Sequence, residues 1–207
     1  MTEERTINEA VEDKTADAAP AEEIVAGDKP KITTVRLAKM AMLVAISIVL
    51  VSFIHFPIIP VVPFLEYDPA DIPILLGTFA FGPLGGIIIT VITAIIQGMT
   101  VSAASSWYGI VMHIAATGAF VLTAGLIYKK HHTKKGAIAA LAFGVLAMTL
   151  IMIPANLIMT PIFMGAPRSA VVALLPAIIA FNFIKAGINA IVTFLIYKRV
   201  SGFLHRQ

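Results

Sequence analysis

The sequence predicts an all-α integral membrane protein with six transmembrane helices and with cytoplasmic N and C termini. Three observations support this prediction. Hydrophobic residues make up 58% of the chain and charged residues only 13%, about half of the charged fraction that a soluble domain carries. Apolar runs recur along the chain, several of them close to the roughly 20 residues that cross a bilayer as a helix. The basic residues after position 30 lie mainly in three clusters, and six crossings bring all three to one side.

The first 30 residues differ in composition from the rest of the chain. They hold nine of the 12 acidic residues, three basic residues and few large apolar side chains. Such a segment cannot bury enough apolar surface to fold alone, and it lacks the basic start and apolar core of a signal peptide. We therefore expect residues 1–30 to form a disordered acidic cytoplasmic tail, with docking to a partner as the alternative. Residues 31–207 are expected to form the membrane domain.

The apolar runs predict the six spans in order. Their approximate ranges are 37–55, from 72 to the stretch at 81–86, 86–97, 107–128, 136–163 and 170–197. The second and third runs are short and meet at Gly82 and Pro83, a pair that is typical of turns. They are either two tightly joined helices or a re-entrant pair, and we favour two helices because that makes the count six.

The positions of lysine and arginine predict the orientation. One cluster precedes the first span, a second occupies residues 129–135 between the fourth and fifth spans, and a third follows the last span at 198–206. With six spans these clusters share one face, and by the positive-inside rule that face is cytoplasmic. Among the bases only Arg168 falls on the opposite face.

After residue 30 the chain has only three acidic residues, and all three lie in "FLEYDPADIP" at residues 64–73. Glu66, Asp68 and Asp71 fall on the predicted outer face, where the positive-inside rule does not disfavour acids. The surrounding loop is rich in proline, which makes it stiff and non-helical. Phe64 and Tyr67 offer rings that can stack on a flat ligand. Asp71 is expected to cap the second helix, to contact a ligand, or both.

Polar side chains inside the predicted spans indicate a candidate binding site. Lys185 is the only base deep within a span, and Asn182, Lys185 and Asn189 share one helix face because they are three and four residues apart. In the fifth span Asn156 and Thr160 repeat the four-residue spacing between two prolines. Charged groups within spans are costly and usually functional. Amides and an ammonium suit a planar polar ligand with carbonyls and ring nitrogens.

The same polar residues also allow a purely structural interpretation. Asn182 would then bridge helices, and Lys185 would pair with Asp71 or Asp68, because a buried ammonium needs a partner. This interpretation accounts for the amide more easily than for the lysine. Both interpretations place these residues in the interior of the bundle rather than against lipid.

Several classes of function lack their motifs. The chain has no cysteine, P-loop, H-E-x-x-H motif or nucleophile elbow. No enzymatic activity, cofactor or metal site is therefore predicted, and the charge distribution does not favour nucleic acid as a partner. Energy for uphill transport would come from another subunit. With a single intramembrane cation and no intramembrane acid, a proton relay is also disfavoured.

Four stretches together resemble one family. They are "AMLVA" at residues 41–45, "FLEYDPADIPILLGTFAFGPLGG" at 64–86, "GAIAALAFGVLAMTLIMIPANLIMTPIFMG" at 136–165 and "LLPAIIAFNFIKAGINA" at 174–190. The specific parts are D-I-P followed by F-G-P-L-G, and then F-N-x-x-K. The chain is similar to the substrate-binding (S) components of energy-coupling-factor (ECF) vitamin transporters, and within them to the riboflavin-binding RibU group. The resemblance spans most of residues 35–200.

The resemblance implies a six-helix substrate-binding domain in the cell membrane that captures riboflavin from outside, beneath the loop after helix one. It implies that Asn156, Asn182 and Lys185 contact the isoalloxazine ring, with Asp71 at the loop–helix junction of the pocket. The A-x-x-x-A motif formed by Ala41 and Ala45 would contact a transmembrane coupling protein. That protein works with two ATPase subunits, and the S component topples in the membrane to release the vitamin inside.

The sequence departs from the RibU group at three places. Glu66 stands where many relatives have lysine, "TAIIQG" at 93–98 replaces a glutamate and a Lys-Asn pair, and His113 stands where an amide is common. The resemblance therefore leaves the contacts to the ribityl or phosphate end of a flavin open. A carboxylate at position 66 would disfavour a phosphorylated flavin such as FMN, weakly in salt. The alternatives are an S component for another vitamin or related metabolite, a membrane interaction protein, and a proton-coupled carrier.

Overall fold

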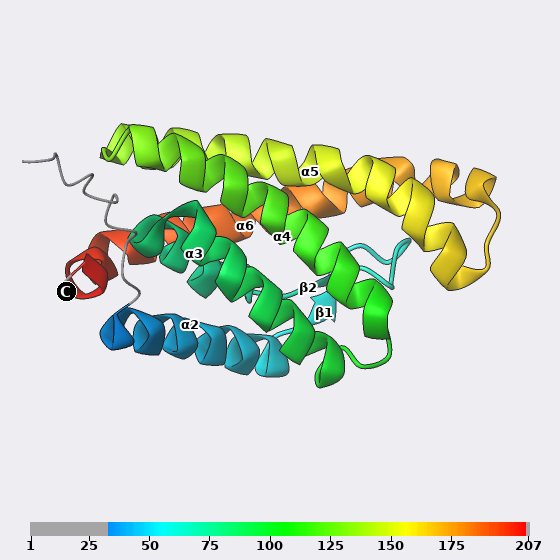
Figure 1. Ribbon diagram of the computed structural model, residues 1–207. Coiled ribbons are helices and arrows are strands. Elements are labelled where there is room, and N and C mark those ends of the chain that lie inside the picture. The colour runs from blue at the N-terminus through cyan, green and yellow to red at the C-terminus, as the bar shows by residue number, and fades with distance from the viewer. Residues whose placement is uncertain (1–32, 206–207) are drawn as a thin grey trace, which may run out of the picture. The chain divides into compact units, whose positions relative to one another are not determined.

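The computed structural model describes residues 33–205, so the tail predicted at residues 1–30 lies outside the described residues. The described part is helical apart from one short two-stranded hairpin (Figure 1). Its elements are α2 (Thr34–Phe53), β1 (Phe56–Pro57), β2 (Glu66–Tyr67), α3 (Asp71–Met99), α4 (Ser106–Lys130), α5 (Lys134–Met164) and α6 (Arg168–His205).

Five helices of the described part are long and apolar enough to cross a membrane, namely α2 to α6. The prediction of a helical membrane protein is therefore confirmed, and the structure has five such elements where six spans were predicted. The difference arises in α3, because its backbone joins the runs predicted as the second and third spans into one element.

Helix α3 is broken at Gly82, whose φ of 81° and ψ of 177° are not helical. The two halves then lie against each other. A Cβ on Gly77 would overlap the side chain of Ile89, and one on Gly86 would overlap the hydroxyl of Thr78. In a straight helix the first pair, 12 residues apart, would be separated by about 18 Å. Helix α3 is therefore a helical hairpin that turns back at Gly82.

One end of the helix bundle joins the turn of α3 to the ends of three other helices. Arg36, in the first turn of α2, donates a hydrogen bond of 2.9 Å to the carbonyl of Phe81. The hydroxyls of Tyr128 in α4 and Tyr197 in α6 are 2.6 Å apart, and the ring of Phe79 packs against both. The helix ends that carry the basic clusters thus meet at one end of the molecule.

Residues 54–70 form the predicted non-helical loop at the opposite end of α2 (Figure 1). Its strands pair antiparallel, with Phe56 opposite Tyr67. The hydroxyl of Ser47 donates to the carbonyl of Ala70 at 3.0 Å, and the fully buried Val62 packs with apolar residues of α6. The loop is therefore held against α2 on one side and α6 on the other.

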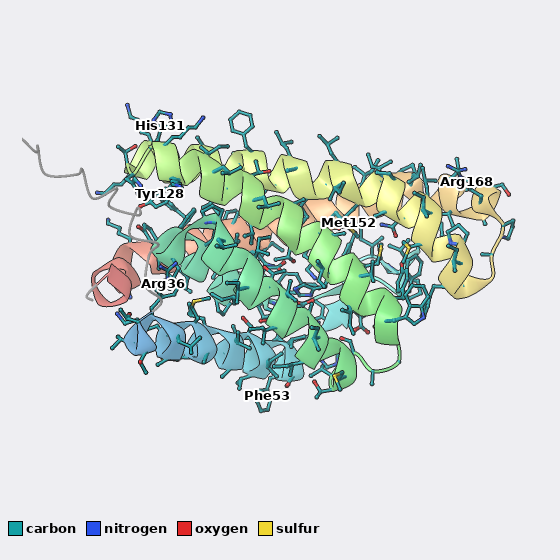
Figure 2. The ribbon with its side chains drawn as sticks, viewed as in Figure 1. Arg36, Phe53, Tyr128, His131, Met152 and Arg168 are labelled. Carbon is teal, nitrogen blue, oxygen red and sulfur yellow. The ribbon has the colours of Figure 1, made fainter. Side chains whose placement is uncertain are left out.

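The helices pack closely inside and expose apolar side chains outside. Phe120 of α4 is fully buried, and a Cβ on Gly144 of α5 would overlap its ring. Figure 2 shows the opposite case at Phe53, which projects from the end of α2 and is 83% exposed. Many leucines, isoleucines and valines of all five helices are exposed in the same way. An apolar outer surface around a partly polar interior is what a bilayer requires.

Candidate ligand-binding site

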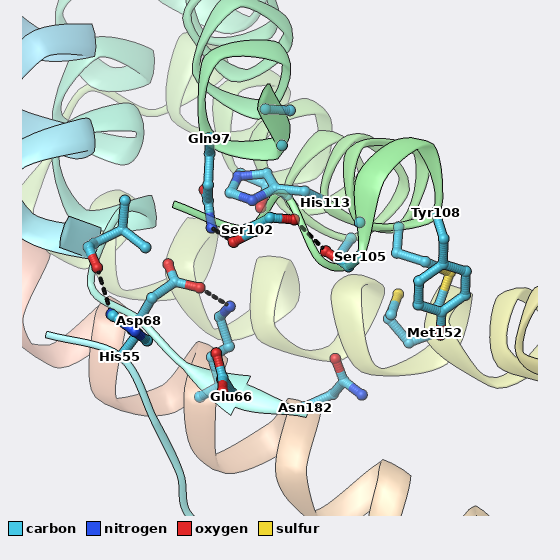
Figure 3. Close-up of a pocket in the computed structure, with 18 of the residues that line it drawn as sticks. His55, Glu66, Asp68, Gln97, Ser102, Ser105, Tyr108, His113, Met152 and Asn182 are labelled. Carbon is cyan, nitrogen blue, oxygen red and sulfur yellow. Dashed lines mark hydrogen bonds and ion pairs between the residues drawn. The ribbon is translucent and has the colours of Figure 1, made fainter. Parts of the chain in front are cut away.

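A cavity of about 160 Å³ lies beneath the loop at residues 54–70, among the helices. Figure 3 shows it with polar side chains on opposite walls. The loop contributes His55, Phe64, Glu66 and Asp68; α3 and the turn after it contribute Ala94, Gln97, Gly98, Ser102 and Ser105. The remaining wall is formed by Val51, Tyr108, Gly109, Met112, His113, Ala116, Thr117, Met148, Met152, Phe181, Asn182 and Lys185.

Lys185 of α6 pairs with Asp68 of the loop across one wall of this cavity. The Nζ atom donates to Oδ2 at 2.7 Å, and the two side chains are only 12% and 8% exposed. Burial alone would raise the pKa of Asp68, but the Lys185 ammonium and the backbone N–H of Ala70 hold the pKa below its usual value. Asp68 is one of the two partners that the structural interpretation of the sequence allowed for Lys185.

Asp71 is fully buried, and its carboxylate accepts hydrogen bonds from two other helices. Thr117 of α4 donates to Oδ1 at 2.7 Å, and Asn189 of α6 donates to Oδ2 at 3.1 Å. The Nε2 atom of His113 lies 3.6 Å from Oδ1. The N-cap of α3 is Ala70 and has no side-chain cap bond, so the expected cap bond from Asp71 is wrong, whereas the carboxylate does lie in the first turn, where the helix N-terminus favours it. The carboxylate sits one residue inside the helix and points at its neighbours instead.

The position of Asp71 also overturns the expectation that no acid lies within a span. Helix α3 begins at Asp71, and the residue belongs to the apolar element that is long enough to cross a membrane. The sequence analysis placed the start of the span one residue later, because charged residues are rare within membrane spans and common in loops. The donors on Thr117 and Asn189 supply the partners that make its burial tolerable.

Tyr67 joins the loop to α6 behind the cavity wall. Its hydroxyl donates to Oδ1 of Asn189 at 3.1 Å, and the amide of Asn189 donates to the carbonyl of Asp68 at 3.2 Å. Burial, and after it the charge of Asp68, raises the pKa of Tyr67, so the phenol keeps its proton and acts as a donor. Tyr67 does not line the cavity but fixes the loop that does.

Asn156 and Thr160 of α5 are fully buried beside the cavity rather than in its wall. Thr160 donates to Oδ1 of Asn156 at 3.0 Å, and the hydroxyl of Tyr108 lies 3.0 Å from that of Thr160. The Asn156 amide donates to the carbonyl of Met152 at 2.8 Å. Tyr108 and Met152 do line the cavity, so this pair adjoins it through them.

The structure therefore divides the predicted ligand-binding residues into two groups. Phe64, Asn182 and Lys185 line the cavity. The other four do not: Asp71, Asn156 and Thr160 each bond to a residue of the wall, whereas Tyr67 bonds to Asn189, which lies behind it.

The sequence pattern did not single out one polar part of the wall, formed by Gln97, Ser102, Ser105 and Thr117. Gln97 and the two serines lie at or just after the end of α3, where a short polar stretch usually indicates a simple turn. The Oε1 atom of Gln97 is buried without a hydrogen-bond partner. An acceptor left open in this way is available to a ligand.

Ala41 and Ala45, predicted to face a partner helix, lie exposed on α2. Both line an apolar groove of about 580 Å³ between α2 and the second half of α3. Small side chains at four-residue spacing allow close approach of another helix.

Comparison with known proteins identifies the family. The model of the family described as "ECF transporter, substrate-specific component" matches residues 35–197. The chain belongs to the family of ECF transporter S components. The solved structure titled "Structure and mechanism of the S component of a bacterial ECF transporter" matches this S component with a TM-score of 0.73 and 35% sequence identity. The match covers 83% of this chain and 98% of the other.

Two curated relatives of this S component are named as riboflavin transporters. "Riboflavin transporter RibU" of Staphylococcus aureus (strain TCH60) is 33% identical over 178 residues, which are 83% of this chain and 93% of the relative. "Riboflavin transporter FmnP" of Bacillus subtilis (strain 168) is 29% identical over 184 residues, 83% of this chain and 95% of the relative. The recognised family is thus confirmed over nearly the whole membrane domain.

Family membership decides several of the expectations raised above. An S component is the substrate-specific part of a transporter and not an enzyme, and it works in partnership with an ECF module. Together with five long apolar helices, this makes the chain a multi-pass protein of the plasma membrane.

Proposed function

We propose that this S component binds riboflavin from outside the cell and delivers it inward together with an ECF module. In this proposal the module consists of a transmembrane coupling protein and two ATPase subunits. The names of the two curated relatives support riboflavin as the ligand. The absence of a P-loop from the sequence agrees with ATP hydrolysis in a separate subunit.

One observation carries the proposed ligand site: a buried ammonium, an amide and an aromatic ring line the same cavity. Lys185 and Asn182 come from α6 and Phe64 from the loop. The amide and the ammonium match the carbonyls and ring nitrogens of an isoalloxazine, and Phe64 can stack on its face. Asn156 is proposed to join them from α5. Tyr67, Asp71 and Thr160 are proposed to hold this wall in place.

The size of the cavity predicts a rearrangement on binding. Its volume of about 160 Å³ is below the roughly 300–1,000 Å³ of pockets that hold drug-sized ligands. The ion pair between Lys185 and Asp68 lies in the cavity wall and ties the loop to α6. We therefore expect the loop to move outward and Lys185 to exchange part of its contact with Asp68 for the ligand.

We further propose six membrane crossings, with the two halves of α3 as separate crossings and with both termini in the cytoplasm. The break at Gly82 and the contacts between the halves support two crossings. The basic clusters at the end of the bundle that holds this turn support its cytoplasmic position. The groove that contains Ala41 and Ala45 is the proposed contact for the coupling protein.

A flavin fluorescence titration of the purified protein in detergent tests the proposed ligand. We expect saturable quenching close to one riboflavin per protein. Lys185→Ala and Asn182→Ala should each raise the Kd about 10- to 100-fold, since a hydrogen bond to a charged group contributes about 1.5–3 kcal/mol and its loss leaves a buried partner unpaired. Lys134→Ala, at the exposed start of α5, should leave the Kd unchanged.

The absence of quenching by folded protein at micromolar riboflavin would contradict the proposed ligand and leave an S component for another vitamin. FMN provides a further comparison. Glu66 is exposed on the cavity rim, so FMN should bind more weakly than riboflavin, and Glu66→Gln should reduce the difference at low ionic strength.

A further inference from the structure

The cavity wall contains more negative than positive charge. Asp68 and Asp71 are buried carboxylates, with side chains 8% and 1% exposed, and Lys185 is the one buried ammonium of the described residues that faces them. With a neutral histidine nearby, this group of side chains carries one net negative charge. A charge of this kind is costly when it is cut off from water unless a cation accompanies it.

His113 is the group placed to supply that cation. Its side chain is 9% exposed, lines the cavity, and has its Nε2 atom 3.6 Å from Oδ1 of Asp71. This distance is too long for a hydrogen bond, and Nε2 is buried with no hydrogen-bond partner. An unpaired ring nitrogen thus points at a buried carboxylate, and one proton would turn the contact into a charged hydrogen bond.

The charged and titratable groups around His113 come from three directions. Helix α3 presents Asp71, the loop presents Asp68, and α6 presents Lys185. On the cavity rim the loop adds Glu66 and His55, both exposed to solvent, and α4 itself adds Tyr108. The parts of α2 and α5 that line the cavity, residues 51, 148 and 152, contribute no titratable group.

A metal ion does not fit this place. Among the described residues no group of three or more histidine, cysteine, aspartate or glutamate side chains is arranged to hold one. Asp68 is engaged by Lys185 and by the N–H of Ala70. Each oxygen of Asp71 accepts one hydrogen bond, from Thr117 on Oδ1 and from Asn189 on Oδ2, and Oδ1 also faces His113. A carboxylate oxygen and an imidazole nitrogen that face each other in this way can share a single proton.

We propose that Asp71 and His113 form a proton-binding site in the cavity wall and that this S component takes up a proton there when its ligand binds. The second half of this proposal rests on the proposed function. A neutral ligand in the cavity displaces water that solvates the negative charge, so the bound state favours the protonated pair. By linkage, the proton must favour the ligand to the same extent.

The sign of the pH dependence follows from this linkage. The Kd for riboflavin is constant at pH values where the free protein already holds the proton. At higher pH the free protein has lost the proton and must recover it on binding, so the Kd rises by up to about tenfold per pH unit. The expected change is weaker binding in alkaline medium, below the pH at which the flavin itself ionises.

Calorimetry of riboflavin binding in two buffers with different ionisation enthalpies measures the proton directly. At a pH in the linked range the wild-type protein should take up between half a proton and one proton per ligand. Asp71→Asn should remove this uptake because it neutralises the excess charge, and His113→Gln should reduce it. His131→Gln is the matched comparison. This histidine is exposed at the end of α4 and does not line the cavity, so the uptake should persist in that variant.

A second measurement does not depend on the ligand. In ligand-free protein with labelled histidine, the NMR signal of the His113 ring should change with pH, and Asp71→Asn should alter this change because it removes the carboxylate that the ring faces. Riboflavin binding without proton uptake would overturn the linkage and leave the proposed function intact. Failure of riboflavin to bind would contradict the proposed function. The NMR titration alone would then test the proton-binding site at Asp71 and His113. A His113 signal that ignores Asp71→Asn would overturn the site.

Discussion

At the scale of single residues, two asparagines on the same face of α6 have different roles. Asn182 lines the cavity, and its amide donates only to the carbonyl of Ile178 in its own helix. Asn189 is fully buried about two turns further along and joins Tyr67, Asp68 and Asp71. The first is placed for a ligand, whereas the second holds the loop and α3 against α6.

This difference predicts opposite effects of the same substitution. Asn189→Ala should lower the free energy of unfolding in detergent by at least about 2 kcal/mol, because buried groups left without a partner cost roughly 1–3 kcal/mol each. Asn182→Ala should change stability much less and ligand affinity much more. Thermal or denaturant unfolding of both variants, followed alongside the flavin titration, measures the two effects. Equal losses of stability in the two variants would contradict the assignment.

At the scale of elements, α3 is the piece that shapes the molecule. Its first half, residues 71–81, is only about 16 Å long at 1.5 Å per residue, roughly half of a bilayer core. Because the turn at Gly82 lies at the basic end of the bundle, this short half begins with Asp71 inside the bundle, and the loop at residues 54–70 would complete the proposed crossing. The cavity beneath the loop is therefore set within the depth of the bundle rather than at its surface.

The turn itself can be tested through its glycine. The backbone at Gly82 has φ of 81° and ψ of 177°, yet a Cβ there would meet nothing within 4 Å. Gly82→Ala should therefore destabilise the protein by about 1–3 kcal/mol through backbone strain alone. Gly187→Ala in α6 also meets nothing but lies in regular helix, so it should be neutral or stabilising by up to about 1 kcal/mol. A Gly82→Ala variant as stable as Gly187→Ala would show that the turn is not formed as described.

At the scale of the whole membrane domain, the two ends of the bundle differ in chemistry. One end ties the first turn of α2 to the turn of α3 through Arg36 and Phe81 and carries the basic clusters. The other end holds the loop, the cavity, and Glu66, Asp68 and Asp71, the acidic residues of the described part. This polarity agrees with a protein that takes its substrate on one face and is driven from the other.

The proposed six crossings predict which positions share a face. The chain has no cysteine, so single cysteines can be introduced at exposed positions without background. Val61→Cys in the loop and Ala103→Cys after α3 should react with a membrane-impermeant maleimide in intact cells, and His131→Cys between α4 and α5 should not. If α3 crossed only once, positions 61 and 103 would lie on opposite sides, and only one of them would react.

Much of the candidate site was accessible to sequence reasoning, though not its connections. The helical spacing of Asn182, Lys185 and Asn189 placed them on one interior face, because a repeat of 3.6 residues is a property of the local chain. The identity of the partner of Lys185 was left open between Asp68 and Asp71. That choice depends on how the loop folds over α6, which is a matter of contacts more than 100 residues apart in the chain.

The sequence by itself determined the membrane class, the approximate spans, the family resemblance and the residues from which a flavin site would be built. These follow from hydropathy, helical periodicity, charge placement and short motifs, all of which are local. Only the tertiary structure decided that Lys185 pairs with Asp68 and that Asp71 is buried inside a helix beside His113. It also decided that four of the predicted ligand residues stand behind the cavity wall. The physical reason is that the burial of a charged group and the identity of its partner depend on which helices and loops meet in the fold. A local sequence pattern does not contain this information.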